Sequence, residues 1–221
     1  MLFRSNDTAT TEIYTRRHTL SLHDALPICL VLGDIAGKGM AGALLMANLQ
    51  ANLRSQCAIA ADQPQRFLRS VNRLFVENTA DSDYATFFFA DYDDQTRRLR
   101  YANCGHLPAL LLRTDGSVEQ LASIATVLGL FNDWDCTLEE RQLAPGDTLV
   151  FYTDGMTEAF NESGEEFGIP RLIAALRRHC DQPPCTLINS LLDEVRHFNP
   201  GEQQDDITLI VAKIRADLSP A

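Results

Sequence analysis

The amino-acid sequence predicts an α+β fold built around antiparallel sheets. Short apolar segments separated by turns predict strands, and several of them follow one another along the chain. Two turns, Asp93-Asp94 and Thr114–Ser117, join consecutive strands, and strands joined by such hairpins pair antiparallel. Segments with apolar residues at helical spacing stand before and after this run of strands. Sheets made from hairpins with helices set apart from them are typical of the α+β class.

From residue 29 onward each expected element is bounded by turn residues, and we find no internal repeat and no linker, so we expect one domain. The expected helices are Met40–Arg54, Gln63–Thr79, Ile169–His179 and Thr186–Phe198. The expected strands are Cys29–Leu32, Ala85–Tyr92, Arg98–Asn103, Ala109–Arg113, Val118–Leu121, 135–143, Thr148–Thr153 and Asp206–Ile214.

Composition narrows the class of protein. Hydrophobic residues make up 45% of the chain and charged residues 22%, values that allow a packed core. The formal net charge of −11 argues against nucleic acid as a partner, because nucleic-acid binders carry basic patches. Six cysteines without a C-x-x-C pair favour reduced thiols and a cytoplasmic location. No apolar run reaches the length of about 18 residues that a membrane span needs.

Residues 1–28 differ from the rest of the chain. They are rich in Thr and short polar residues, show neither helical nor strand periodicity, and contain no apolar core of a signal peptide. The stretches NDTATTEIYT and SLHDALPI are similar to translated sequencing-adapter sequence. We therefore interpret residues 1–28 as a non-native or unstructured segment, residues 29–215 as the domain, and residues 216–221 as a tail.

Three aspartates share one context, at the end of an apolar strand or directly before one. Asp34 follows Cys29–Gly33, Asp154 follows Leu149–Thr153, and Asp205 stands with Asp206 before Ile207–Val211. Carboxylates that converge repel one another unless a cation neutralises them, and hard divalent cations prefer oxygen ligands. The alternative is that aspartate is simply a favourable turn residue. Periodicity alone does not show that the three aspartates meet in space.

Five motifs resemble those of the metal-dependent PPM (protein phosphatase 2C-like) serine/threonine phosphatases, and of their bacterial SpoIIE/RsbU-type branch in particular. They occur in the family's order over more than four-fifths of the chain: LVLGDIAGKGMAGALLMANLQANLR (30–54), ATFFFADYD (85–93), LRYANCGHLPALLL (99–112), LAPGDTLVFYTDGMTEAFNESGEEFG (143–168) and QQDDITLIVAKI (203–214). The resemblance implies a four-layer α-β-β-α sandwich, two antiparallel sheets flanked by helix pairs, here with the family's first strand missing.

The resemblance also implies a centre with two Mn or Mg ions. Asp34 would bridge the ions, the carbonyl of Ile35 would supply a further ligand, and Asp154 and Asp205 would complete the protein ligands. Asp206 is the alternative to Asp205, because an Asp-Asp pair leaves the register open by one residue. Gly155 would allow close backbone approach. Lys38 would help to position phosphate, or would be a solvated turn residue.

The activity implied is hydrolysis of phosphoserine or phosphothreonine in a protein by water that two metal ions activate, with a metal-bound water as the general acid. By family analogy the substrate is a phosphorylated STAS-type anti-anti-sigma regulator, and an upstream sensor or receiver domain controls the phosphatase. Helices 40–54 and 63–79, which follow Asp34 directly, are where such control is expected. The alternative is a binding or regulatory module of the same fold with impaired catalysis, because the acidic residue of the family's first strand is missing.

The sequence is less consistent with two other kinds of site, a nucleotide-binding P-loop and a zinc site. Gly33–Gly39 is glycine-rich and leads into a helix, but it has three residues between its glycines where a P-loop has four, and Gly39 follows the lysine. Cys104 and His106 could ligate zinc, yet no second Cys/His pair stands nearby. We interpret His106, in the motif Asn103-Cys-Gly-His106, as a structural residue of the turn between two strands.

Overall fold

The computed structural model describes residues 28–37, 39–60, 63–79, 83–201 and 205–215. The chain divides into two compact units, and each is described by itself. The N-terminal unit comprises Met1–His106 and Ser123–Gln142, and the C-terminal unit comprises Leu107–Ala122 and Leu143–Ala221. The interpretation of residues 1–28 falls almost entirely outside the described residues, and so does that of the tail. That residues 29–215 form one functional domain stays a prediction.

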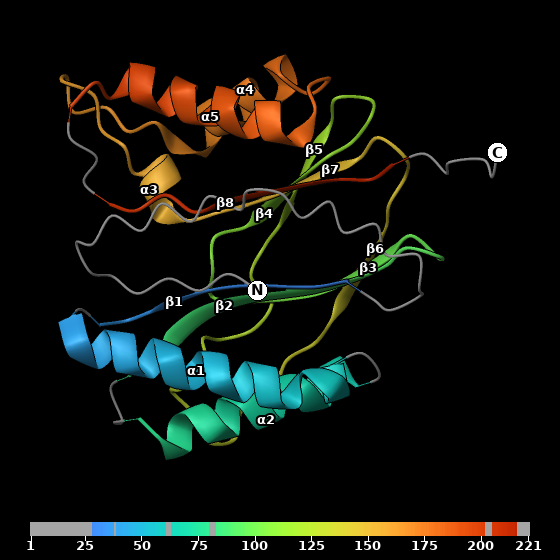
Figure 1. Ribbon diagram of the computed structural model, residues 1–221, viewed down its shortest axis with the longest axis vertical. Coiled ribbons are helices and arrows are strands. Elements are labelled where there is room, and N and C mark those ends of the chain that lie inside the picture. Colours follow the sequence, from blue (N-terminus) through green and yellow to red (C-terminus); the bar gives the residue numbers. More distant parts are fainter. Residues whose placement is uncertain (1–27, 38, 61–62, 80–82, 202–204, 216–221) are drawn as a thin grey trace. The chain divides into compact units, whose positions relative to one another are not determined.

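The sheet of the N-terminal unit has the strand order β1-β2-β3-β6, with every neighbouring pair antiparallel. These strands are β1 (Ile28–Ile35), β2 (Ala85–Asp93), β3 (Arg98–Cys104) and β6 (Glu139–Gln142). Two helices, α1 (Gly39–Ala60) and α2 (Pro64–Glu77), cover one face of this sheet (Figure 1). Alternate strand residues such as Val31, Phe87 and Phe89 pack against them.

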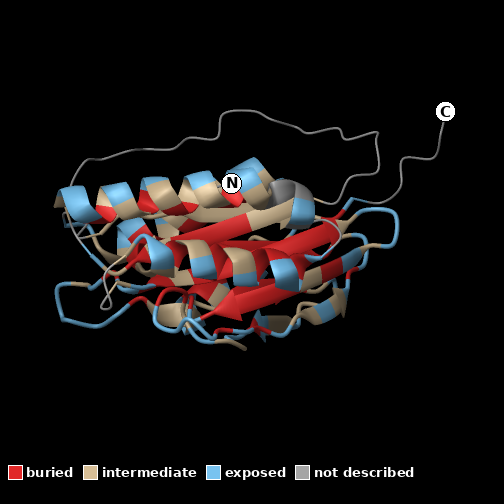
Figure 2. Cartoon of the chain, turned by 90° about the horizontal axis from the view of Figure 1, so that it is seen from below, coloured by how far each residue is buried: buried red, intermediate tan, exposed pale blue. Residues whose placement is uncertain are grey.

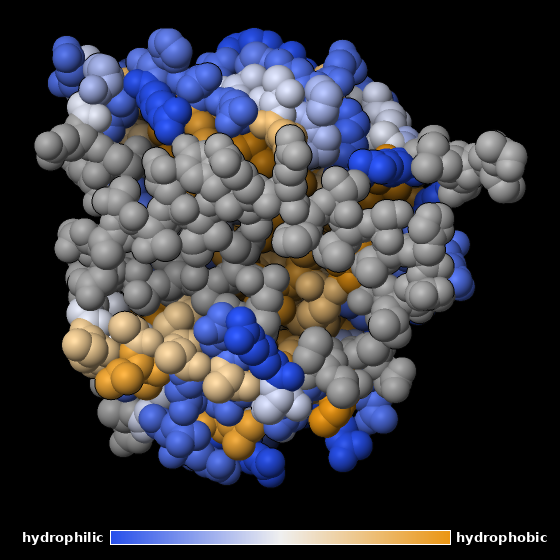
Figure 3. Space-filling model, in the orientation of Figure 1, coloured by the Kyte–Doolittle hydropathy of each residue, from blue (hydrophilic) through white to orange (hydrophobic). Residues whose placement is uncertain are grey.

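The two helices of this unit differ in amphipathicity. α2 buries Phe67, Leu68, Val71 and Phe75 at helical spacing and exposes charged residues on its other side. α1 buries Leu49 and Leu53, but Arg54 is its one charged residue in the sequence. Its outer side is apolar as well, with Met40 77% and Leu44 65% exposed, and Figure 3 shows hydrophobic surface over α1.

The sheet of the C-terminal unit has the order β5-β4-β7-β8 and is also antiparallel throughout. Its strands are β4 (Ala109–Leu112), β5 (Val118–Leu121), β7 (Thr148–Tyr152) and β8 (Leu209–Lys213). A short helix, α3 (Asp154–Thr157), follows β7 directly. The pair α4 (Gly168–Arg178) and α5 (Pro184–Phe198) packs on one face of the sheet through residues that include Leu172, Leu176, Leu187 and Leu191.

The structure confirms the α+β class and the two antiparallel sheets. In the view of Figure 2 the strands are mostly buried, while the outer sides of the helices are exposed, as amphipathic packing requires. Several expected boundaries were wrong. β1 continues to Ile35 because its ladder with β2 extends to Ala85, and the predicted strand 135–143 shortens to Glu139–Gln142. α1 continues to Ala60, past the predicted end at Arg54, and β8 begins at Leu209 where Asp206 was predicted. The sequence analysis also missed α3, because four residues are too few for periodicity.

Candidate functional site

Asp34 lies in the N-terminal unit, one residue before the end of β1, and is half-buried. Its neighbours in the strand, Gly33 and Ile35, have the opposite orientation, and Ile35 packs with α1 and α2. Asp34 therefore belongs to the sheet face that does not carry these helices. Its partner across the ladder is Thr86 of β2, which lies on the same face. One carboxylate oxygen of Asp34, Oδ1, is inaccessible to solvent.

The backbone next to Asp34 supports the expected role of the Ile35 carbonyl. Ala85, which stands opposite Ile35, exchanges both of its backbone hydrogen bonds with Leu128, at 2.9 Å each. Ile35 and Ala85 therefore form a pair of the ladder without hydrogen bonds between them, in which the backbone groups of Ile35 point away from β2. Its carbonyl is thus directed to the edge of the described sheet, where β1 is the outer strand.

A turn at the end of β3 places His106 against Thr86. The two side chains are 3.0 Å apart, from His106 Nδ1 to Thr86 Oγ1. The backbone N–H of His106 donates to Oδ1 of the fully buried Asn103 at 2.9 Å. Gly105, with φ of +76°, adopts the left-handed conformation that the turn requires, and a Cβ there would lie 2.4 Å from Cγ1 of Val127. The turn is therefore fixed by several independent constraints.

The C-terminal unit brings Asp154 and Asp205 together. Thr153 donates its backbone N–H to the carbonyl of Thr208 at 3.1 Å, and its Oγ1 accepts from the backbone N–H of Thr208 at 2.9 Å. These bonds align the two segments that carry the aspartates. At Gly155 the approach is so close that an added Cβ would lie 2.4 Å from the carbonyl oxygen of Asp206. The predicted role of Gly155 as a point of close backbone approach agrees with this geometry.

Each of the two aspartates is held by the peptide that follows it. The backbone N–H of Gly155 donates to Asp154 Oδ1, and that of Asp206 donates to Asp205 Oδ1, both at 2.9 Å. Asp154 also begins α3, where the partial positive charge of a helix N-terminus favours a carboxylate. These backbone contacts orient both carboxylates.

Glu158 is an acidic neighbour that the sequence analysis missed. Desolvation raises the pKa of its carboxyl, and the negative charges of Asp154, Glu166 and Asp205 raise it further. Its position four residues after Asp154, on the next helical turn, is the signal that could have identified it. The charge of Asp205 is the smallest of the causes of this rise, after those of Asp154 and Glu166. Asp206 stays the alternative to Asp205 in the register.

The oxygen groups described in each unit, carboxylates and the Ile35 carbonyl, are the ligand types that hard divalent cations prefer. The described residues contain no group of three or more His, Cys, Asp or Glu side chains arranged to hold a metal ion. Cys104 is buried in the core, and this burial raises the pKa of its thiol, which disfavours the thiolate that zinc binding needs. Lys38 lies outside the described residues.

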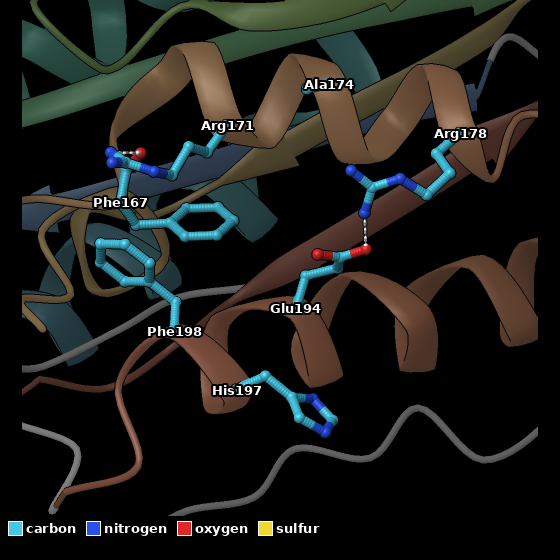
Figure 4. Close-up of a pocket in the computed structure, with 7 residues that line it drawn as sticks. All are labelled: Phe167, Arg171, Ala174, Arg178, Glu194, His197 and Phe198. Atoms are coloured by element: carbon cyan, nitrogen blue, oxygen red, sulfur yellow. Dashed lines mark hydrogen bonds and ion pairs between the residues drawn. The ribbon is translucent and has the colours of Figure 1, made fainter.

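A groove of about 410 Å³ in the C-terminal unit lies between α4 and α5 and contains none of the predicted site residues (Figure 4). Its charged groups are engaged in packing. Arg171 stacks over the ring of Phe198, 4.7 Å from the centroid, and Arg178 pairs with Glu194. We interpret the groove as the surface of the packing contact between α4 and α5.

The comparisons with known proteins agree with the resemblance seen in the sequence. The family model described as stage II sporulation protein E (SpoIIE) matches residues 26–215. The phosphoserine phosphatase RsbU of Bacillus subtilis is 27% identical over 191 residues, which are 86% of this chain. The chain spans 56% of the length of RsbU.

Solved structures share the fold over most of the chain. The PP2C domain of SiaA from Pseudomonas aeruginosa is 25% identical, with a TM-score of 0.75 over 88% of this chain and 78% of that domain. The catalytic domain of the serine/threonine phosphatase PstP, solved in complex with two manganese ions, is 17% identical. Its TM-score is 0.62, over 85% of this chain and 88% of the other, and it supports the fold alone. Of the helices that the structure describes, none has the length and apolar character to cross a membrane.

Proposed function

The chain belongs to the SpoIIE family, and on that premise we propose that it is a metal-dependent phosphatase acting on phosphoserine or phosphothreonine in a protein. The observation that carries the proposal is the pairing of two carboxylates from distant segments, Asp154 and Asp205, through the Thr153–Thr208 contacts. Both aspartates are half-buried on adjacent segments, and carboxylates that converge in this way suit a bound divalent cation.

We assign the ligands as the sequence predicts them. Asp34, Asp154 and Asp205 would hold two Mn or Mg ions by their carboxylates, and Ile35 would contribute its carbonyl oxygen. When bound, such ions supply Lewis-acid activation of water and neutralise charge on the phosphoryl oxygens. The chain's own residues fix where the carboxylates stand: the β1–β2 ladder orients Asp34, and the N–H groups of Gly155 and Asp206 orient the other two.

The experiment that tests this proposal measures hydrolysis of p-nitrophenyl phosphate with and without Mn²⁺, for the wild type and for Asp34→Asn. We expect turnover only with Mn²⁺, and a loss of at least about 100-fold in the variant, because the altered group would contact the ions directly. Asp133→Asn is the matched control, since Asp133 is an exposed aspartate of the same unit. Metal-independent turnover, or an Asp34→Asn variant as active as the wild type, would refute the proposal.

A parallel measurement of Mn²⁺ binding separates this function from its alternative. Wild-type protein that binds Mn²⁺ but hydrolyses neither p-nitrophenyl phosphate nor a phosphoserine protein would be the impaired binding or regulatory module. Protein that binds no Mn²⁺ would exclude the metal centre as assigned.

The substrate and the control of the enzyme belong to the same proposal. We propose a phosphorylated STAS-type anti-anti-sigma regulator as the substrate and a cytoplasmic location, by analogy with the family. An upstream sensor or receiver domain would act on α1 and α2, and the exposed apolar side chains of Met40 and Leu44 support a contact there. Dephosphorylation of a purified phospho-STAS protein, followed by mass spectrometry, tests the first part.

A further inference from the structure

We propose that Tyr84, Leu130 and Phe131 form a docking surface for the phosphoprotein substrate, outside the metal centre. The inference rests on the proposed function, because it concerns how the substrate of that same site is recognised. Leu130 and Phe131 belong to the loop between β5 and β6, which lies outside the five family motifs of the sequence.

The first observation is the exposure of these side chains. Leu130 is 41% and Phe131 54% exposed, although both are large and apolar. Tyr84, at 37%, stands in the segment directly before β2. The two segments touch, because a Cβ added at Gly129 would lie 2.7 Å from the carbonyl oxygen of Asp83. Single exposed apolar residues are common on protein surfaces, whereas a group of them marks a contact site.

The second observation is that the loop is held in place while these side chains stay outside. Asn72 of α2, only 1% exposed, accepts the backbone N–H of Gly129 at 2.9 Å and donates its Nδ2 to the carbonyl of Phe131 at 3.0 Å. Gly129 has a φ of +100°, and an added Cβ would lie 2.8 Å from the ring of Phe75. The backbone is therefore fixed on both sides of Leu130. A surface fixed in this way binds without the cost of ordering a loop.

The third observation is the place of the loop in the N-terminal unit. Leu128 exchanges both backbone hydrogen bonds with Ala85, at 2.9 Å each, and Ala85 stands opposite Ile35 in the β1–β2 ladder. The carbonyl of Tyr84 accepts the backbone N–H of Ala36, also at 2.9 Å. The docking surface is therefore connected by backbone hydrogen bonds to the end of β1, where the predicted metal ligands of this unit lie.

This position determines the partner that the surface fits. A protein that brings a phosphoserine to the end of β1 has to place its own surface over the segments around that end. The chemistry that matches is an apolar patch beside the phosphoserine. The rim of that patch should be neutral or basic, because the exposed Asp133 follows Phe131 by two residues. A small phosphate ester such as p-nitrophenyl phosphate has no such surface and depends on the metal centre alone.

The test compares the kinetic constants of the full chain for a purified phospho-STAS protein and for p-nitrophenyl phosphate, both with Mn²⁺. We expect Phe131→Ser to raise the KM for the phosphoprotein by at least about tenfold, because exposed aromatic anchors dominate many interfaces. Its kcat for the phosphoprotein and both constants for p-nitrophenyl phosphate should stay within about twofold, since only binding remote from the reaction is lost. Leu130→Ser should act in the same direction, and Phe131→Leu should retain most of the affinity.

Ile59→Ser is the matched control. Ile59 is a large apolar residue of the same unit, 38% exposed, and lies about 30 Å along α1 from the start of that helix. Its substitution should leave the constants for both substrates unchanged. Melting temperatures measured in parallel show whether each variant folds as the wild type does.

The outcomes distinguish this inference from the proposed function. If the wild type hydrolyses p-nitrophenyl phosphate with Mn²⁺ and Phe131→Ser has an unchanged KM for the phospho-STAS protein, the inference falls while the metal centre stands. A wild type that hydrolyses only the small ester, or a Phe131→Ser variant that loses activity equally on both substrates, would also overturn it. An unchanged KM together with a dimer in sedimentation velocity that Phe131→Ser abolishes would assign the surface to a second copy of the chain. A wild type without Mn²⁺-dependent turnover would overturn both proposals.

Discussion

The carboxylates of the two units have different surroundings. In the N-terminal unit, Asp34 lies within a strand, opposite Thr86 in the ladder, and its Oδ1 is inaccessible to solvent. In the C-terminal unit, Asp154 and Asp205 stand just outside strands, and peptide N–H groups donate to them. A contact made by a side chain can be removed by one substitution. A contact made by a backbone N–H is lost only when the chain itself is displaced.

Gly155 and Gly105 show the same contrast between contacts made by backbone and contacts made by side chains. A Cβ at Gly155 would meet the backbone of Asp206 at 2.4 Å, whereas a Cβ at Gly105 would meet a methyl group of Val127 at the same distance. The backbone of Asp206 is held by the Thr153–Thr208 hydrogen bonds, so it cannot easily shift to make room for a Cβ at Gly155. The overlap at Gly105 is with a side chain, which a substitution of Val127 can shorten. Both helix pairs pack through apolar residues, and the Arg178–Glu194 ion pair additionally bridges α4 and α5.

The largest effect is expected from Gly155→Ala. The new methyl group would push the segment of Asp206 away from Asp154, and a displacement of about 1 Å at a reaction site can cost about 100-fold in rate. We expect at least that loss of phosphatase activity, together with weaker Mn²⁺ binding. Gly201→Ala is the control, because its Cβ would meet only the side chain of Asn199, at 3.2 Å. Full activity of Gly155→Ala would show that the close approach is not needed.

The next prediction concerns the register of the Asp-Asp pair. The charge of Asp205 contributes to the raised pKa of the Glu158 carboxyl. Asp206 accepts a hydrogen bond from the Thr153 hydroxyl at its backbone carbonyl. Asp205→Asn should therefore weaken Mn²⁺ binding by more than about tenfold, and Asp206→Asn should have a much smaller effect. Isothermal titration calorimetry with Mn²⁺ decides between them. The reverse order would assign Asp206 as the ligand.

Gly105→Ala should destabilise the N-terminal unit by about 2–4 kcal/mol, from the left-handed backbone and from the overlap with Val127. Adding Val127→Ala should recover the part due to overlap and leave about 1–2 kcal/mol. Urea unfolding of the single and double variants measures both parts. Shortening a neighbouring side chain should not restore the activity of Gly155→Ala, because its overlap is with backbone. Such a restoration would contradict the contrast between the two turns.

The smallest effect on stability is expected at the packing contact between α4 and α5. Burial by itself would raise the pKa of Glu194, but hydrogen bonds from Arg178 and His179 lower it overall. A lowered pKa means that the ionised carboxylate stabilises the fold above its unfolded-state pKa of about 4.3, and that this contribution is lost as the pH falls through the folded-state pKa. Glu194→Gln should therefore lower stability at pH 7 by less than about 1 kcal/mol, and the difference should vanish in acid. Thermal unfolding across this pH range checks the sign.

Much of the fold follows from local patterns. α2, α4 and α5 lie where helical spacing of apolar residues placed them, and Val118–Leu121 is the predicted strand in full. The family motifs also selected Asp34, Asp154 and Asp205, although no pattern in the sequence shows contact between them. β1 was predicted too short because the alternation of its side chains does not reveal how far the partner strand runs.

The sequence by itself determined the class of fold, the order of its elements and the acidic residues worth testing, because periodicity and turn chemistry are local properties of the chain. The tertiary structure decided which groups stand beside those acids. The strand register places Thr86 opposite Asp34, and the turn after β3 places the ring of His106 on Thr86. Neither contact could be read from the sequence. The charges of Asp154, Glu166 and Asp205 all act on the carboxyl of Glu158, and only the fold brings these segments near it. Such pairings depend on strand register and on contacts between distant segments, which local propensity does not encode.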